Sequence, residues 1–179
     1  NDEMRHKMRQ DVAEMEAMIE STLLFAREEG NPEHCLQVDL VSLVESVCDG
    51  LPGVEVSLAE GVPNRLVLEC QPLAVRRCVG NLVSNAVRYG GHVKVTLSAD
   101  SGCARITVED DGPGIAPADI DRVFEPFLRL DTSRNRETGG VGLGLAIART
   151  VARNQGGDVS LSNRPGGGLC ATVQLPISR

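Results

Sequence analysis

The chain has 179 residues, of which 41% are hydrophobic and only 2% aromatic. This length suits one domain with a modest extension, and its core must be built from Val, Leu, Ile and Ala. The net charge of −7 argues against a nonspecific nucleic-acid binder, which would carry a basic face, so we expect no nucleic-acid partner.

Membrane and metal signals are weak in this sequence. No run approaches the roughly 18–20 apolar residues that span a bilayer, and no signal peptide is visible. The chain begins with Asn, so we expect it to be excised from something longer. The six cysteines form no C-x-x-C pair and lie near no His at zinc-finger spacing. We expect buried free thiols in a reducing cytoplasm.

Residues 1–30 contain a long predicted helix, from about Asp2 to Glu29. Its seam residues alternate by four and three positions, a 3.5-residue period typical of a coiled coil or four-helix bundle. Such a helix needs a partner, so we expect a homodimer through it; the alternative is a helix lying on its own domain. Residues 31–38 are expected to be a linker after Gly30. The seam residues are Met8, Val12, Met15, Ile19, Thr22 and Ala26.

The remaining residues, 39–179, mix strands and helices without a strict βαβ alternation. We therefore expect an α+β fold, a two-layer sandwich in which three helices cover one face of a mixed sheet. Strands are expected where apolar residues alternate: Val54–Leu58, Leu66–Leu68, Val93–Leu97, Ala104–Val108, Val159–Ser162 and Leu169–Leu175. Helices are expected from Asp39 to about Asp49, from Pro72 through Tyr89, over Pro117–Phe124, and from Gly142 to about Asn154.

The helix that contains Asn81–Tyr89 carries polar side chains on one face. Asn81, Asn85 and Arg88 recur at i, i+4 and i+7. An Asn inside a helix is not there for helix propensity, and its amide oxygen suits Mg²⁺, which prefers oxygen ligands and substrate phosphates. Arg88 can meet the phosphates themselves. Taken alone, a helix with two incidental amides is the simpler interpretation.

Three further blocks follow: Asp110–Ile115 after a strand, Phe124–Phe127 after a short helix, and Gly140–Leu145 at a helix start. In this order, the four blocks resemble the N, G1, F and G2 boxes of the ATP-binding domain of sensor histidine kinases. That domain belongs to the wider family shared with gyrase, Hsp90 and MutL. The resemblance covers about Asp39 to Ile177, and four blocks in register are far more specific than one glycine-rich run. It implies a Bergerat-type fold that binds ATP and Mg²⁺.

The resemblance also implies a role for each block. Asp110 would accept a hydrogen bond from the exocyclic amine of adenine, although alone it could equally close a tight turn. The glycine-rich helix start would cradle phosphates, although alone it could be a hinge; it is not a Walker sequence. Asn85 would bind the metal. The expected cofactor-binding residues are Asn85, Tyr89, Asp110, Gly112, Gly114, Ile115, Gly140, Gly142, Leu143, Gly144 and Leu145.

The expected catalytic residues are Asn81, Arg88 and Arg129. Arg129 resembles the Arg of the family's lid, here Leu128–Gly139, whose base Phe124 and Phe127 would pack against the body. In the gyrase and Hsp90 branch, a Glu at the place of Asn81 acts as general base for water, and an amide cannot take a proton. Because a histidine imidazole is already a nucleophile near neutral pH, Asn81 favours transfer to histidine.

The chain departs from the family at its front, where the acceptor block, roughly His-Glu-Leu-Arg-Thr-Pro, is absent. None of His6, His34 and His92 lies in such a motif. Residues 1–30 therefore resemble the second helix of the dimerisation hairpin without the first. The implied partners are the acceptor-histidine hairpin and a response regulator, and the implied location is the cytoplasmic portion of an inner-membrane sensor. The alternatives are a non-catalytic nucleotide-binding module and a gyrase/Hsp90-type ATPase.

Overall fold

The computed structural model describes Met4, Met8, Ile19 and residues 33–100, 102–130 and 142–177. Met4, Met8 and Ile19 are helical and exposed, and the rest of the predicted long helix lies outside the described residues. Most of the predicted lid and Gly140 also lie outside them. Within the described ranges, no helix combines the length and apolar character needed to cross a membrane.

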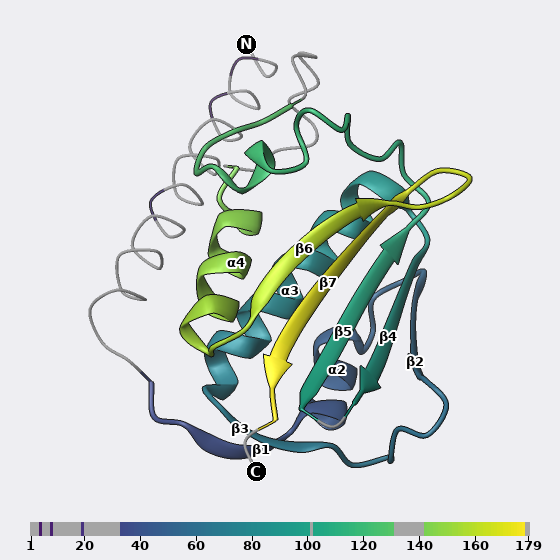
Figure 1. Cartoon of the computed structure of the whole chain (residues 1–179). Helices are drawn as coiled ribbons and strands as arrows, with labels where there is room; N and C mark the ends of the chain where they lie inside the picture. The colour runs from purple at the N-terminus through teal and green to yellow at the C-terminus, as the bar shows by residue number, and fades with distance from the viewer. Residues whose placement is uncertain are drawn as a thin grey trace.

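A five-stranded sheet forms one layer of the molecule (Figure 1). Its strands run in the order β2-β4-β5-β7-β6. β2 pairs with β4 in parallel and all other neighbours are antiparallel, so the sheet is mixed, as predicted. The strand bounds are Val54–Leu58 for β2, Val93–Ala99 for β4, Cys103–Asp110 for β5, Asp158–Asn163 for β6 and Leu169–Pro176 for β7.

Three helices cover one face of this sheet: α2 (Leu40–Cys48), α3 (Pro72–Gly90) and α4 (Gly144–Asn154) (Figure 1). Alternate residues of the strands pack beneath them, because successive side chains of a strand point to opposite faces. On β4 and β5 the buried set is Val93, Val95, Leu97, Ala104, Ile106 and Val108. The predicted two-layer α+β sandwich is confirmed.

A second, two-stranded sheet was not predicted. β1 (Leu36–Asp39) pairs antiparallel with β3 (Val67–Cys70), so part of the expected linker 31–38 belongs to the folded body. Asp39 caps α2 as predicted, since its Oδ1 accepts a hydrogen bond from the Val41 amide at 3.2 Å. The same oxygen accepts one from the Leu66 amide at 3.2 Å, which ties the start of α2 to the entry of β3.

Hydrogen bonds join the start of α3 to the end of α4. Gln71 and Gln155 exchange hydrogen bonds of 2.9 and 2.7 Å, linking the start of α3 to the end of α4. The Glu33 carboxylate accepts from the amides of Leu73 and Ala74 at 3.0 and 3.1 Å. Since these amides belong to the first turn of α3, Glu33 fixes the segment before β1 to that helix.

The predicted helix Pro117–Phe124 forms only in part. Its regular portion is a 3₁₀ turn, η1, over Arg122–Phe124. The Asp119 amide bonds three residues back, to Ala116, whereas the Val123 amide bonds four residues back. Because these bonds do not share one spacing, the segment is a series of turns rather than an α-helix.

The six cysteines are all free thiols. Cys48, Cys70 and Cys78 are buried, Cys103 and Cys170 are half-buried, and Cys35 is exposed. Burial raises the pKa of Cys78 to about 12, so this thiol stays protonated and packs as a small apolar group.

Candidate functional site

A cavity of about 390 Å³ opens between α3, the end of β5 and the start of α4. It brings together three of the four sequence blocks, which are distant along the chain. Its lining also includes the segment that follows η1, so nearly every predicted site residue that the structure describes meets here. The predicted residues that line it are Asn81, Asn85, Arg88, Tyr89, Asp110, Gly114, Ile115, Arg129, Gly142, Gly144 and Leu145.

Asp110 is the only buried polar or charged residue among those described, with 6% of its surface exposed. Its Oδ1 accepts hydrogen bonds from the amides of Gly112 at 2.8 Å and Leu169 at 3.3 Å. Both bonds go to one oxygen. Within the described part of the chain, Oδ2 therefore keeps its accepting capacity for a ligand in the cavity, which suits an amine donor.

Two glycines let the backbone approach Asp110 closely. A Cβ at Gly112 would lie 2.8 Å from Oδ1 of Asp110, and one at Gly90 would lie 2.4 Å from its Cβ. Gly112 was predicted as a site residue, but Gly90 was not. Gly90 ends α3 and carries no motif signal of its own, so only the packing of α3 against β5 reveals its role.

Asn81 and Asn85 face the start of α4 from one side of α3. An added Cβ at Gly144 would lie 3.7 Å from Nδ2 of Asn85 and 3.9 Å from Cβ of Asn81. The Nδ2 of Asn81 is buried and meets no hydrogen-bond acceptor among the described residues. A buried, unpaired donor is costly, so this amide fits a ligand that brings an acceptor.

The first turn of α4 offers further donors to the cavity. Its N-cap residue, Leu143, makes no side-chain hydrogen bond, and the first intrahelical bond runs from the Ile147 amide to the Leu143 carbonyl at 2.9 Å. The earlier amides have no partner inside the helix, and the helix dipole adds partial positive charge. The Leu143 side chain, predicted as cofactor-binding, is only 2% exposed and packs in the core, because it anchors the helix start.

The segment before the predicted lid contacts the glycine-rich block through its backbone. The Phe127 amide donates to the Gly142 carbonyl at 3.0 Å, and Phe127 has a positive φ of 66°. Phe124 packs against the core as predicted, with the Arg149 guanidinium 4.3 Å from its ring centroid. The expectation that Phe127 packs in the same way is wrong, since its side chain is 54% exposed.

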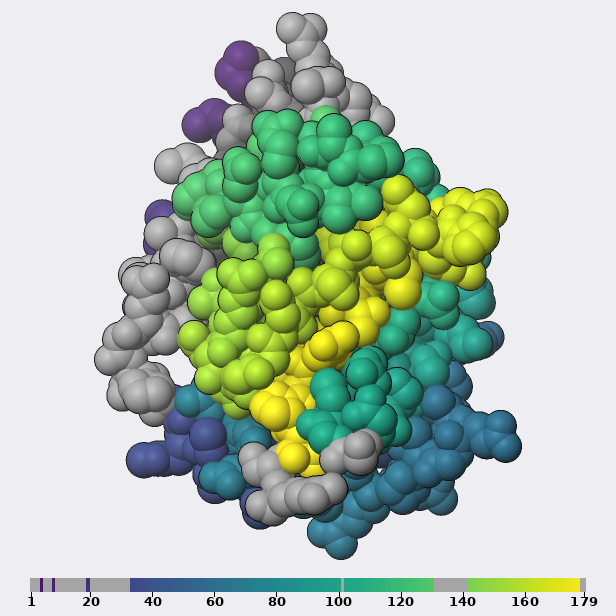
Figure 2. All heavy atoms as spheres, viewed as in Figure 1, coloured from purple at the N-terminus to yellow at the C-terminus, as the bar shows by residue number. Residues whose placement is uncertain are grey.

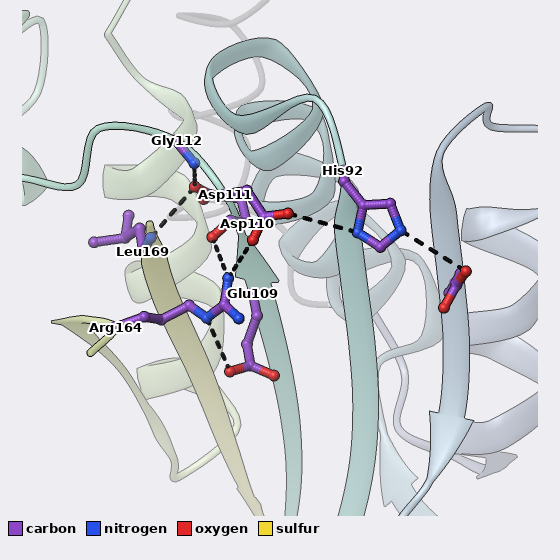
Figure 3. A network of polar contacts seen from close by, with 8 residues as sticks. His92, Glu109, Asp110, Asp111, Gly112, Arg164 and Leu169 are labelled. Atoms are coloured by element: carbon purple, nitrogen blue, oxygen red, sulfur yellow. Dashed lines mark hydrogen bonds and ion pairs between the residues drawn. The ribbon is translucent and has the colours of Figure 1, made fainter. Parts of the chain in front are cut away.

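Both strands of the hairpin between β6 and β7 were predicted, but its contacts with the loop after β5 were not. Asn163 and Arg164 form hydrogen bonds with the loop after β5, and Figure 3 shows those of Arg164. In the sequence, the stretch Pro165–Gly168 only separates the two strands. No local pattern could link it to a loop about fifty residues earlier in the chain, because that contact depends on the strand order of the sheet.

The profile of the histidine kinase-, DNA gyrase B- and HSP90-like ATPase family matches residues 70–179. The chain belongs to this family. The matched range holds α3, β5 and α4, so it includes every element that lines the cavity. The predicted resemblance to the ATP-binding domain of sensor histidine kinases is confirmed.

Individual members of the family agree with this assignment. The sensor histidine kinase GtrS of Pseudomonas aeruginosa is 34% identical over 98% of this chain, which spans 36% of the length of GtrS. The histidine kinase domain of the Escherichia coli osmosensor EnvZ is 35% identical, with a TM-score of 0.62 over 84% of this chain and 93% of that domain. Full-length ShkA in complex with AMPPNP is 27% identical, with a TM-score of 0.74 over 90% of this chain and 35% of ShkA.

Proposed function

We propose that this chain is the ATP-binding and phosphoryl-donating domain of a sensor histidine kinase. One observation carries the proposal: within the described residues, a single cavity holds a buried carboxylate that uses only one of its oxygens at one side, and a helix start without a side-chain cap at the other. A carboxylate suits the exocyclic amine of adenine, and a helix start suits phosphate. The AMPPNP complex of ShkA, which carries an ATP analogue, supports this ligand class.

The proposed roles divide the cavity into two sides. On the base side, Asp110 accepts from the adenine amine, while Tyr89, Gly112, Gly114 and Ile115 border the base. On the phosphate side, the donors are the backbone amides of Gly142, which lies before α4, and of Gly144 and Leu145 in its first turn, and Gly140 extends this block. Arg88 and Arg129 supply positive charge, with Arg129 at the γ-phosphate. Asn81 donates its unpaired amide to the same group.

Asn85 is the proposed protein ligand for Mg²⁺. Its amide oxygen lies beside the start of α4, on the proposed phosphate side. Within the described ranges, no three His, Cys, Asp or Glu side chains cluster to hold a metal ion. An amide oxygen alone binds Mg²⁺ weakly, so the metal would arrive with the nucleotide and draw its other ligands from phosphates and water. Bound there, it would neutralise charge on the transferring phosphoryl group.

The proposed acceptor is a histidine on the dimerisation hairpin, from which the phosphoryl group passes to an aspartate of a response regulator. Asn81 stands where the ATPases of the family carry a general base, and an amide cannot accept a proton from water. Residues 1–30 would be the second helix of that hairpin and the homodimer contact. The whole protein would then be an inner-membrane sensor with this part in the cytoplasm, and the fragment alone would not phosphorylate itself.

Calorimetry with Mg-ATP and metal-free ATP tests the nucleotide site. Asn85→Ala should weaken Mg-ATP binding about tenfold and leave metal-free ATP unchanged, because one metal ligand is lost. Asp110→Asn should weaken ATP binding between about ten- and a hundredfold in both conditions, since a charged hydrogen-bond acceptor is lost. Unchanged nucleotide binding in both variants would contradict the assignment.

Transfer is tested with γ-labelled ATP, with and without a separate hairpin that carries an acceptor histidine. We expect acid-labile label on the hairpin only. Label on this chain alone that His6→Gln abolishes would show that the acceptor lies within residues 1–30. Rapid release of free phosphate without the hairpin would favour the ATPase alternative.

A further inference from the structure

The hairpin between β6 and β7 forms hydrogen bonds with the loop that begins at Asp110. Figure 2 shows its tip (yellow) projecting beside the green segment that follows β5. The paired register of β5 and β7 ends at Glu109 and Cys170, one residue before Asp110. On this side, the backbone of Asp110 therefore lies beyond the ladder and needs other partners to hold its orientation.

Arg164 supplies those partners from the hairpin (Figure 3). Its Nη1 donates to the main-chain carbonyl of Asp110 at 2.7 Å and to Oδ1 of Asp111 at 2.6 Å. Its Nε lies 3.3 Å from Oε1 of Glu109. One guanidinium thus contacts three consecutive residues, and the rigid fork of an arginine can do so where a lysine could make only part of the set.

Asn163 holds the other end of the same loop. Its Oδ1 accepts from the Ile115 amide at 2.8 Å, and its Nδ2 donates to the Ile115 carbonyl at 2.7 Å. The Leu169 amide, at the start of β7, donates to the carboxylate of Asp110 itself. The hairpin therefore fixes the loop at its first residue, at its last residue and at the carboxylate.

The arrangement around Arg164 is more than an exposed ion pair. Exposed pairs contribute little, because water and salt screen them. The Arg164 side chain is only 31% exposed, and its contact with the Asp110 carbonyl fixes the peptide from which the carboxylate projects. Loss of that contact would leave the carboxylate in place but loosen its direction toward the cavity, and hydrogen bonds weaken steeply with angle.

We propose that Arg164 is a positioning residue for base selection, which orients Asp110 so that an adenine amine is favoured over a 6-oxo purine. This inference rests on the proposed function, because it assumes that Asp110 reads the base. Arg164 contacts the peptide of Asp110 and the flanking carboxylates of the loop, so in this proposal it acts on the base through Asp110. Its effect should therefore be on selectivity between bases.

The test compares binding of Mg-ATP and Mg-ITP, which differ at the 6-position of the purine, by calorimetry. Arg164→Gln should weaken ATP binding about tenfold and change ITP binding little, so the preference for ATP falls by about the same factor. Arg164→Lys should keep part of the preference. The matched control is Arg105→Gln, which removes a similar pair, with Asp100 at 2.6 Å, from the opposite end of β5.

The outcomes separate this inference from the proposed function. If the wild-type chain prefers ATP and Asp110→Asn abolishes the preference, the proposed function holds. An unchanged preference in Arg164→Gln would then overturn the positioning role alone. Equal loss of ATP and ITP binding, with a lowered melting temperature, would also overturn it, because that pattern means general damage to the fold. A wild-type chain that binds both nucleotides equally would overturn the role of Asp110 itself.

Discussion

The two sides of the cavity differ in how many partners their functional groups already have. On the base side, Asp110 accepts hydrogen bonds from two backbone amides, and Arg164 and Asn163 form hydrogen bonds with the loop around it. On the phosphate side, the amide nitrogen of Asn81 has no acceptor within the described residues, and the start of α4 has no side-chain cap there. Contacts within the chain thus fix the base side before a ligand binds, with Oδ2 of Asp110 still able to accept a hydrogen bond, whereas the phosphate side carries a donor without an acceptor among the described residues.

This difference indicates how binding energy is divided. A preformed base side loses little conformational freedom on binding, so it discriminates between bases by geometry. The phosphate side gains partners only when an anion arrives, which relieves buried donors that are costly to leave unpaired. Base selection and phosphate binding should therefore respond to different substitutions.

The largest expected effect comes from filling the space behind Asp110. Gly90→Ala places a Cβ 2.4 Å from the Cβ of Asp110, so we expect a loss of about 1–3 kcal/mol in the free energy of unfolding. The matched change is Gly144→Ala, whose Cβ meets its nearest neighbour at 3.7 Å. That substitution should leave stability unchanged or raise it by up to about 1 kcal/mol, since Ala favours the helix. Urea denaturation of both variants checks this, and equal effects would contradict the contrast.

A second pair compares an amide that has partners with one that has none. Asn163→Ala removes both hydrogen bonds to Ile115 and should cost about 1 kcal/mol of stability. Asn81→Ala removes an unpaired donor and should change stability by less than about 0.5 kcal/mol. In calorimetry, only Asn81→Ala should weaken the binding of ATP more than the binding of adenosine. A larger stability loss in Asn81→Ala would mean that its amide is already satisfied.

The base side was predicted from sequence less completely than the phosphate side. Asp110 could be predicted because it lies at the end of a strand, and the side-chain amides of Asn81 and Asn85 could be predicted because their spacing places them on one face of α3. Arg164 could not be predicted, since its contact depends on β7 lying between β5 and β6. The short β1 strand was missed because its four residues, Leu36–Asp39, are too few for their alternation to stand out from a linker, and Leu36 and Gln37 are exposed.

The smallest expected effect lies at the far end of α4, away from both sides. Partial burial alone would raise the pKa of Asp158, but hydrogen bonds from Arg149 and Arg153 lower it to about 2. A folded pKa below the unfolded value of about 3.9 stabilises the protein above that pH, and the contribution disappears as the pH falls through 2.

Urea denaturation of the wild-type chain and Asp158→Asn, from pH 6 down to pH 2, checks this anchor. The difference in the free energy of unfolding between the wild type and Asp158→Asn should be constant above about pH 4. It should shrink below that pH, because protonation removes the charge that both arginines bind. Because Asp158 is 45% exposed, the difference should also fall with added salt. A difference that does not change with pH would rule out this ion pair as the source.

Amide hydrogen exchange, measured residue by residue by NMR with and without Mg-AMPPNP, tests the contrast between the two sides most directly. We expect the amides of Gly112, Ile115 and Leu169 to be protected without nucleotide and to change little when it binds. The amides of Gly144, Leu145 and Ala146 should exchange rapidly alone and become protected with nucleotide. Base-side amides that exchange as fast as those of the α4 start before nucleotide is added would contradict the account.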